Sequence, residues 1–178
     1  MRKQLETLLP EIRLVKDPEL RELTVKVWVE AMKRAGWGIK DLAEMPFTLL
    51  IKHTEVNLIT HTRAVTLSAL KIAEVLMAEY GEKITIHRDH LLSGALLHDV
   101  GKLFEYRREG GKFIKSREGE LLRHPISGAA FAFAHGLPQE VIHIIAVHSK
   151  EGDGSRRTIE AIIVNHADFV NFDVLKDE

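Results

Sequence analysis

The sequence of 178 residues contains no cysteine. This absence excludes disulfide bonds, thiolate nucleophiles and thiolate metal sites together. A metal ion bound to this chain would therefore have imidazole and carboxylate ligands. Histidine, in contrast, is abundant, with ten residues in the chain.

The sequence also lacks an excess of either charge and a long apolar segment. Its 25 Lys and Arg residues against 26 Asp and Glu residues leave a formal net charge of −1. No overall field therefore attracts the chain to nucleic acid or to a membrane. We find neither an apolar run of about 18 residues nor a signal peptide at the N-terminus. These absences predict a cytoplasmic protein that holds any anionic ligand through a local group of residues.

The spacing of apolar residues is helical along most of the chain. The clearest helix follows Asp17 and Pro18 and stops at Gly36. The predicted helices cover residues 18–35, 55–80, 87–100, 124–136, 138–149 and 158–175. Between the third and fourth, the pair Gly110-Gly111 separates short aromatic and charged segments, which predicts a small β-hairpin or an ordered loop.

The length and composition favour a single core. A chain of this length with 45% hydrophobic residues can bury roughly 70% of its unfolded surface. We therefore expect one all-α domain over residues 1–178, a bundle of six or seven helices with an N-terminal helical region at about residues 1–50. The number of subunits stays open.

Six histidine and aspartate residues lie on the apolar faces or at the starts of these helices. They are His61, His98, Asp99, His124, His148 and Asp168. A single histidine on an apolar face is usually a core residue whose ring is hydrogen-bonded. Six such groups cannot all be buried cheaply, whereas a divalent cation accepts neutral imidazoles and ionised carboxylates together. The sequence therefore predicts a metal site formed by residues 51–178.

Asp99 is the expected bridge between two ions. It follows His98 at a helix end, so the two side chains diverge by about 100° around the axis and can serve different ions. Two ions about 3.5 to 4 Å apart can share a hydroxide and clamp both reacting oxygens of a phosphoryl displacement. One ion is the alternative, since His124 and His148 could contact substrate instead.

These residues resemble the H…HD…D signature of the HD-domain metal-dependent phosphohydrolases. His61, the pair His98-Asp99 and Asp168 match it, and "HDVGK" is close to the common form HDIGK. The resemblance extends from "LITHTRAV" to "NHADFV", and "GELLRHPISG" is most similar to the HD portion of bacterial 3′-5′ exoribonucleases. The chain departs from those enzymes at His148-Ser149, where they often have a histidine pair, and it lacks the tripeptide of the HD-GYP cyclic-dinucleotide phosphodiesterases.

The resemblance implies an HD-domain bundle with a defined set of ligands and an activity. One divalent ion would be held by His61, His98, Asp99 and Asp168, and a second by Asp99, His124 and His148. Metal-activated water would hydrolyse a nucleotide or a related phosphomonoester or phosphodiester, and short RNA is a further candidate partner. Mn²⁺ or Fe²⁺ is the expected ion, although Mg²⁺, Co²⁺, Ni²⁺ and Zn²⁺ suit the same ligands.

Four further residues are candidates for substrate contact. Because the resemblance places a lysine after the doublet, Lys102 is expected to stabilise charge on a metal-bound phosphate, while Asp99 orients the ions and receives a proton. Lys150 and Arg156 border the loop after His148 and would either bind a second phosphate or form an ordinary charged loop. His53 is a weaker candidate for lining the cleft.

Two other residues are given a structural interpretation. For Arg63, which follows His61 by two positions, a surface role is at least as well supported as substrate contact. His166 shares a face with Ile159 and Ile162, so we expect it in the core.

Three alternative functions remain open at this stage. Some HD-fold proteins use the same six ligands for a di-iron oxygenase. A non-catalytic nucleotide-sensing module and a purely structural metal site are the other two. Oxygen consumption would favour the oxygenase, and nucleotide binding without turnover would favour the sensing module. Unfolding on chelation would favour the structural metal site.

Overall fold

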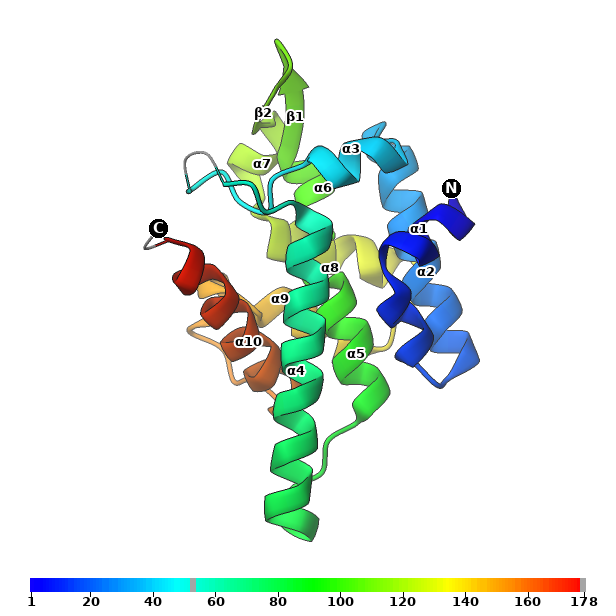
Figure 1. Cartoon of the computed structure of the whole chain (residues 1–178), viewed down its shortest axis with the longest axis vertical. Coiled ribbons are helices and arrows are strands. Elements are labelled where there is room, and N and C mark those ends of the chain that lie inside the picture. The colour runs from blue at the N-terminus through cyan, green and yellow to red at the C-terminus, as the bar shows by residue number, and fades with distance from the viewer. Residues whose placement is uncertain (52–53, 177–178) are drawn as a thin grey trace.

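The computed structural model describes residues 1–51 and 54–176. In these ranges the fold is helical apart from one two-stranded hairpin, as Figure 1 shows. The all-α bundle predicted from the sequence is therefore confirmed. None of the helices in the described ranges combines the length and the apolar character needed to cross a bilayer.

The six predicted helices are all present. They are α2 (Pro18–Ala35), α4 (Leu58–Tyr80), α5 (Arg88–Leu97), α8 (His124–Ala134), α9 (Gln139–Val147) and α10 (Ile159–Lys176). Asp17 caps α2 by accepting hydrogen bonds from the backbone N–H groups of Glu19 and Leu20, and Gly36 ends the helix with a φ of 75°.

The structure adds short helices that the spacing of apolar residues did not reveal. They are α1 (Arg2–Leu8), α3 (Ile39–Glu44), α6 (Lys102–Glu105) and α7 (Arg117–Leu121), with 3-10 turns η1 (Pro10–Leu14), η2 (Gly81–Lys83) and η3 (Lys150–Gly152). Segments of this length span two turns or fewer, too few to show a period of 3.6 residues.

The predicted hairpin follows α6. Strand β1 (Tyr106–Glu109) pairs antiparallel with β2 (Lys112–Lys115), and Glu109 lies opposite Lys112. Gly110 and Gly111 form the turn with φ values of 55° and 78°, the positive angles that a two-residue hairpin turn requires. Figure 1 shows the hairpin projecting from one end of the bundle.

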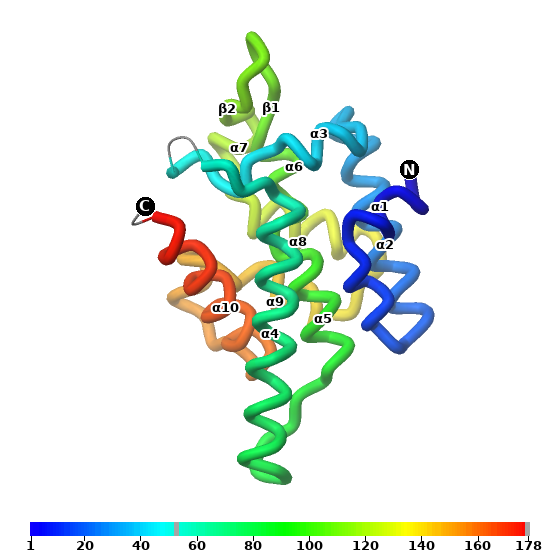
Figure 2. The backbone as a smooth tube through the Cα atoms, viewed as in Figure 1, coloured from blue at the N-terminus to red at the C-terminus, as the bar shows by residue number. Residues whose placement is uncertain are grey.

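Helix α5 lies at the centre of the packing. It contacts α4, α9 and α10 on one side and α2 on the other, and Figure 2 shows α10 and the N-terminal helices on opposite sides of the bundle. Leu92 and Leu96 belong to an apolar cluster built with the N-terminal region, whereas Leu91 and Ala95 belong to a second cluster with α4, α9 and α10. The residue that follows α5 is consequently delivered to the middle of the molecule.

A glycine sets the separation of α5 and α9. A Cβ atom at Gly94 would lie 2.6 Å from Cγ2 of Ile144, so only glycine permits this approach of the two helices. Gly94 precedes His98 by four residues, and Ile144 precedes His148 by four residues. The close contact therefore lies one turn before each histidine.

The core interpretation of His166 is wrong. His166 is exposed, and Ile162 and Val170 on the same helix are also exposed, by 43% and 61%. Helix α10 packs on α4, α5 and α9 through the face of Val164 and Ala167, and its opposite face carries apolar residues in contact with water. The sequence alone did not distinguish these two apolar faces.

Candidate metal centre

Five helical segments place the six predicted histidine and aspartate residues. His61 lies in the first turns of α4, His124 opens α8, and Asp168 lies within α10. His98 and His148 directly follow α5 and α9. The four histidines and Asp99 are each at most 7% exposed, so the group forms a buried polar centre.

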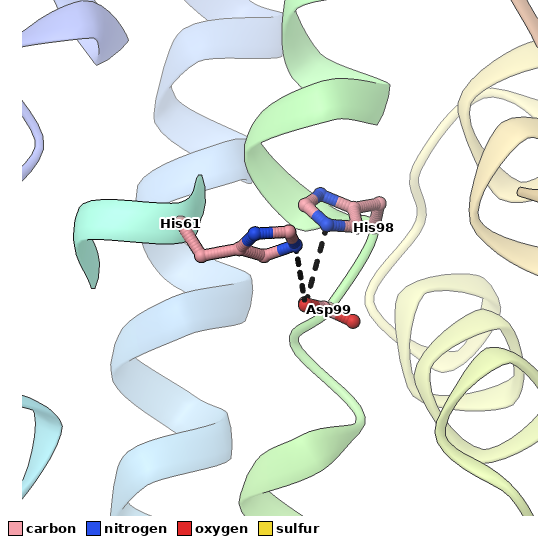
Figure 3. Close-up of side chains that lie close together, drawn as sticks. All are labelled: His61, His98 and Asp99. Carbon is pink, nitrogen blue, oxygen red and sulfur yellow. Dashed lines mark ion pairs between the residues drawn. The ribbon is translucent and has the colours of Figure 1, made fainter. Parts of the chain in front are cut away.

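One carboxylate oxygen of Asp99 faces a first group of histidines. Its Oδ2 lies 3.6 Å from Nε2 of His61 and 3.3 Å from Nε2 of His98, as Figure 3 shows. Asp168 completes this group, because its Oδ1 lies 2.9 Å from Nε2 of His61 and 3.8 Å from Nε2 of His98. His61, His98 and Asp99 are close enough to ligate one ion together.

The other carboxylate oxygen of Asp99 faces a second group. Its Oδ1 lies 3.2 Å from Nε2 of His124 and 3.8 Å from Nε2 of His148. These three residues are also close enough to ligate one ion. Asp99 thus divides its two oxygens between the groups, the arrangement expected of a bridging ligand.

Hydrogen bonds fix the rings of three histidines so that Nε2 points into the centre. Nδ1 of His98 donates to the carbonyl of Ala95 at 2.6 Å, and Nδ1 of His148 donates to the carbonyl of Ile145 at 2.7 Å. Nδ1 of His124 donates to a side-chain carboxylate at 2.8 Å. With the proton on Nδ1, each Nε2 is an acceptor with a free lone pair.

Two observations show that a cation fits among these lone pairs. Nε2 of His98 is buried and has no hydrogen-bond partner. Nε2 of His124 lies 3.2 Å from Nε2 of His148, and two acceptor nitrogens at that distance repel unless a positive charge lies nearby. Neutral imidazoles and carboxylates are suitable ligands for a divalent ion, so the donor set fits a metal.

Burial controls the charge of the histidine rings. It lowers the pKa of His148 to about 3 and also lowers the pKa of His61, so both rings are neutral near pH 7. Burial would lower the pKa of His98 as well, but the Asp99 carboxylate outweighs it and the pKa is raised. Asp99 therefore attracts positive charge to this ring, as either a proton or a metal ion.

Both carboxyl groups are ionised. Burial alone would raise the pKa of Asp168, but the hydrogen bond with His61 and the charges of His98 and His148 together lower the pKa to about 2. Burial would likewise raise the pKa of Asp99, but Lys102, His98 and His124 together hold the pKa well below its usual value. Ionised carboxylates are the form that binds metal.

Lys102 is part of the centre, and it contacts Asp99 directly. Its Nζ donates to Oδ2 of Asp99 at 2.7 Å and to the backbone carbonyl of Phe47. Only 7% of the lysine is exposed, and the residue also lines the adjoining cleft. The sequence placed Lys102 near the ligands, but it did not reveal that the lysine is paired with one of them.

The centre opens onto a cleft of about 400 Å³. The cleft has charged and aromatic lining residues. The charged ones outside the ligand groups are Lys102, Lys115, Arg123 and Lys150 together with Glu105 and Glu151. An aromatic wall, defined here as Phe47, Phe169 and Phe172, lies beside Asp168.

The remaining predicted residues have different locations. Lys150 lines the cleft, whereas Arg156 is exposed and does not line it. Nε of Arg63 donates to Glu11 at 2.9 Å, which agrees with a surface role. His53 lies outside the described residues.

Sequence reasoning missed several residues of the cleft. Glu105, Arg123 and the aromatic wall were not considered. Glu105 did carry a signal, because an acidic residue within the apolar and aromatic segment "KLFEY" shortly after the HD doublet needs a partner when buried. Phe47 offered no such signal, since only the path of the chain between α3 and α4 brings it to the centre.

Comparison with known proteins agrees with this geometry. The HD domain family matches residues 58–171. The chain is 36% identical over 171 residues to a dihydroneopterin 2′,3′-cyclic phosphate phosphodiesterase of Methanocaldococcus jannaschii, covering 92% of this chain and 67% of the relative. No solved structure matches the chain.

Two bacterial enzymes match over shorter segments. Ribonuclease Y of Acidothermus cellulolyticus is 35% identical over 44% of this chain, and ribonuclease Y of Rubrobacter xylanophilus is 31% identical over 65% of it. The chain spans only 13% and 18% of these two relatives.

The chain belongs to the HD domain family. It is a metal-dependent phosphohydrolase, the class that the sequence predicted.

Proposed function

We propose that the protein is a phosphodiesterase that hydrolyses a small phosphodiester carrying a flat aromatic group. The observation that carries the proposal is the division of the two Asp99 oxygens between two groups of histidines, next to a cleft with cationic and aromatic lining residues. This arrangement provides ligands for ions, cations for phosphate oxygens and a surface for a ring.

The metal ligands follow from the two groups. His61, His98, Asp99 and Asp168 would hold one divalent ion, and Asp99, His124 and His148 would hold a second. Mn²⁺ or Fe²⁺ is favoured by the mixture of imidazole and carboxylate ligands. A divalent ion bound here supplies a water molecule of lowered pKa and polarises phosphate oxygens.

Side chains of the protein would provide the other contacts that phosphodiester hydrolysis requires. Lys102 lines the cleft beside the ligands, where its ammonium group would stabilise negative charge that develops on the phosphate oxygens. Lys150, which also lines the cleft, would bind further phosphate oxygens. Asp99 would hold the two groups of ligands in register, because each of its oxygens faces one group. Arg156 would contact only a substrate that extends beyond the cleft.

The aromatic wall supports a flat group on the substrate. Phe172 and Phe47 have ring centroids 6.0 Å apart, and both line the cleft beside Asp168. Aromatic side chains bind planar rings through stacking or edge contacts. The archaeal relative is named for a cyclic phosphate of dihydroneopterin, a substrate of this kind, so a pterin or nucleoside 2′,3′-cyclic phosphate is the proposed substrate.

A substrate screen tests the proposal. Purified protein with Mn²⁺ or Fe²⁺ would be offered dihydroneopterin 2′,3′-cyclic phosphate, nucleoside 2′,3′-cyclic phosphates, cyclic dinucleotides, nucleoside monophosphates, bis(nitrophenyl) phosphate and short RNA. We expect the cyclic phosphates to be opened to monoesters, with loss of activity on chelation. Release of inorganic phosphate from monoesters alone would refute the proposal, as would cleavage of RNA alone, oxygen consumption with a substrate, or binding without turnover.

A pair of phenylalanine variants tests the aromatic wall. Phe172→Ala should raise KM for a cyclic phosphate with an aromatic ring, because the ring loses its contact surface. Phe133→Ala is the matched control, since Phe133 is 71% exposed on α8 and does not line the cleft. Equal KM values in the two variants would show that the ring binds elsewhere.

A further inference from the structure

Glu105, the last residue of α6, is a buried carboxylate that the proposed mechanism does not use. It is 4% exposed. Its Oε2 accepts two hydrogen bonds from a single residue, from the backbone N–H of His124 at 2.9 Å and from Nδ1 of the same residue at 2.8 Å. One oxygen atom therefore holds both the start of α8 and the rotation of the His124 ring.

The ring bond determines which nitrogen of His124 carries the proton. A carboxylate at Nδ1 keeps the proton there, so Nε2 presents its lone pair 3.2 Å from Oδ1 of Asp99. Without an acceptor at Nδ1, the proton can move to Nε2 and form a hydrogen bond to Asp99 instead. A protonated Nε2 cannot ligate a metal ion.

His124 differs in this respect from its two neighbours. Nδ1 of His98 and Nδ1 of His148 each donate to a backbone carbonyl three residues earlier in the chain. Those acceptors are present whatever the side chains are. Among these three histidines, His124 is the one whose ring depends on another residue's side chain.

The position of Glu105 is itself fixed by the segment after the hairpin. The backbone N–H of Ser116 donates to the carbonyl of Glu105 at 2.8 Å. Gly119 packs so closely that a Cβ atom there would lie 2.7 Å from Cγ of Glu105. Nε of Arg123 lies 3.5 Å from the second carboxylate oxygen. Three neighbours thus restrict the carboxylate to the side of the His124 ring.

We propose that Glu105 is a positioning residue that controls whether the second group, Asp99, His124 and His148, holds a divalent ion. The inference rests on the metal roles in the proposed function. The first group takes His61 from α4, His98 from the end of α5 and Asp168 from α10. None of these three residues is hydrogen-bonded to Glu105. Loss of the Glu105 carboxylate should therefore affect one ion and leave the other.

Counting bound ions tests this inference without reference to activity. Mn²⁺ titration by calorimetry and elemental analysis would compare the wild type with Glu105→Ala and Glu105→Gln. We expect two ions in the wild type, and in Glu105→Ala a second ion bound about 10 to 100 times more weakly, as is typical when a residue orienting a ligand is removed. Glu105→Gln keeps an acceptor oxygen and should lose less affinity. Magnetic coupling between two Mn²⁺ ions should weaken in the same order.

Glu160→Gln is the matched control. Glu160 is 8% exposed and accepts a hydrogen bond from the backbone N–H of His87 at 2.8 Å, next to the start of α5. It therefore resembles Glu105 as a buried carboxylate bound to the N–H of a helix start, but it lies two helical turns before Asp168 on α10. Both ions should remain in this variant even if its stability falls.

Three outcomes would overturn the inference. They are one bound ion in the wild type, a second ion of wild-type affinity in both Glu105 variants, and loss of both ions in the conservative Gln variant. If Glu105→Ala does not fold, the folded Gln variant decides through its affinity for the second ion. A different result would refute the proposed function and leave the role of Glu105 intact. In that case the wild type would bind two ions, the variants would bind the second ion more weakly, and no protein would show phosphodiesterase activity.

Discussion

Substituting Gly94 by alanine should both destabilise the fold and disturb the metal centre. The added Cβ would lie 2.6, 2.7 and 2.9 Å from three atoms of Ile144, whereas ordinary contact begins at 3.4 Å. Ile144 is fully buried and β-branched. One of the three atoms is the Cβ atom of Ile144. Rotation of the Ile144 side chain does not move this atom, so the helices α5 and α9 must separate to relieve the overlap.

Gly94→Ala should lower the stability of the fold, whereas a glycine-to-alanine substitution without steric overlap would raise it. Replacing glycine by alanine inside a helix normally stabilises it by about 1 kcal/mol. Overpacking a core costs about 1 to 3 kcal/mol, and the three close contacts favour the upper half of this range. We therefore expect a net loss of about 1 to 2 kcal/mol, or a fall in Tm of roughly 2 to 8 °C for a chain of this size.

A double-mutant cycle measures this effect. Urea and thermal unfolding of the metal-free proteins would compare the wild type, Gly94→Ala, Ile144→Ala and the double variant. Ile144→Ala alone should cost about 2 to 5 kcal/mol. Because Ile144→Ala removes two of the three overlapping atoms and leaves only the Cβ contact at 2.9 Å, the double variant should lose less stability than the sum of the two single losses. A rise in Tm for Gly94→Ala, or additive losses, would refute the close approach of α5 and α9.

The other expected outcomes concern catalysis, metal removal and stability. Lys102→Ala should retain the bound metal and lower kcat at least about tenfold, the equivalent of 1.4 kcal/mol, and an unchanged kcat would exclude a role in stabilising phosphate charge. Chelation should abolish activity but preserve the helical circular dichroism signal, because the helices that carry the ligands also pack on one another through buried apolar residues; unfolding would indicate a structural ion instead. Asp17→Ala should lower stability by about 1 kcal/mol through loss of the α2 cap, with kcat unchanged, and a fall in kcat would link α2 to the site.

The long helices were predictable because their signals are local. The Asp17 cap and Gly36 stop mark both ends of α2, and apolar residues repeat over several turns of α4. The polar residues of the centre were predictable for a related reason. Histidines and aspartates on apolar helix faces are rare enough to suggest a shared ligand.

Other features depend on contacts between distant segments and were not predictable. Glu105 binds a residue 19 positions later, and Phe47 reaches the cleft from the connection between α3 and α4. The exposure of His166 depends on which side of α10 meets its neighbours. A periodic pattern gives the period of a helix, but it does not decide between two apolar faces.

The rings of His98 and His148 extend the rigid ends of α5 and α9, and each is anchored to a carbonyl of its own helix. As proposed ligands, the two rings would keep their positions without an ion, so an ion could depart and be replaced while the helices stay assembled. Sites of nitrogen and oxygen donors bind several first-row metals, and availability decides among them. The metal found in a purified sample would consequently reflect which metals were available during growth and purification. Reconstitution with each metal in turn is the way to learn which one supports turnover.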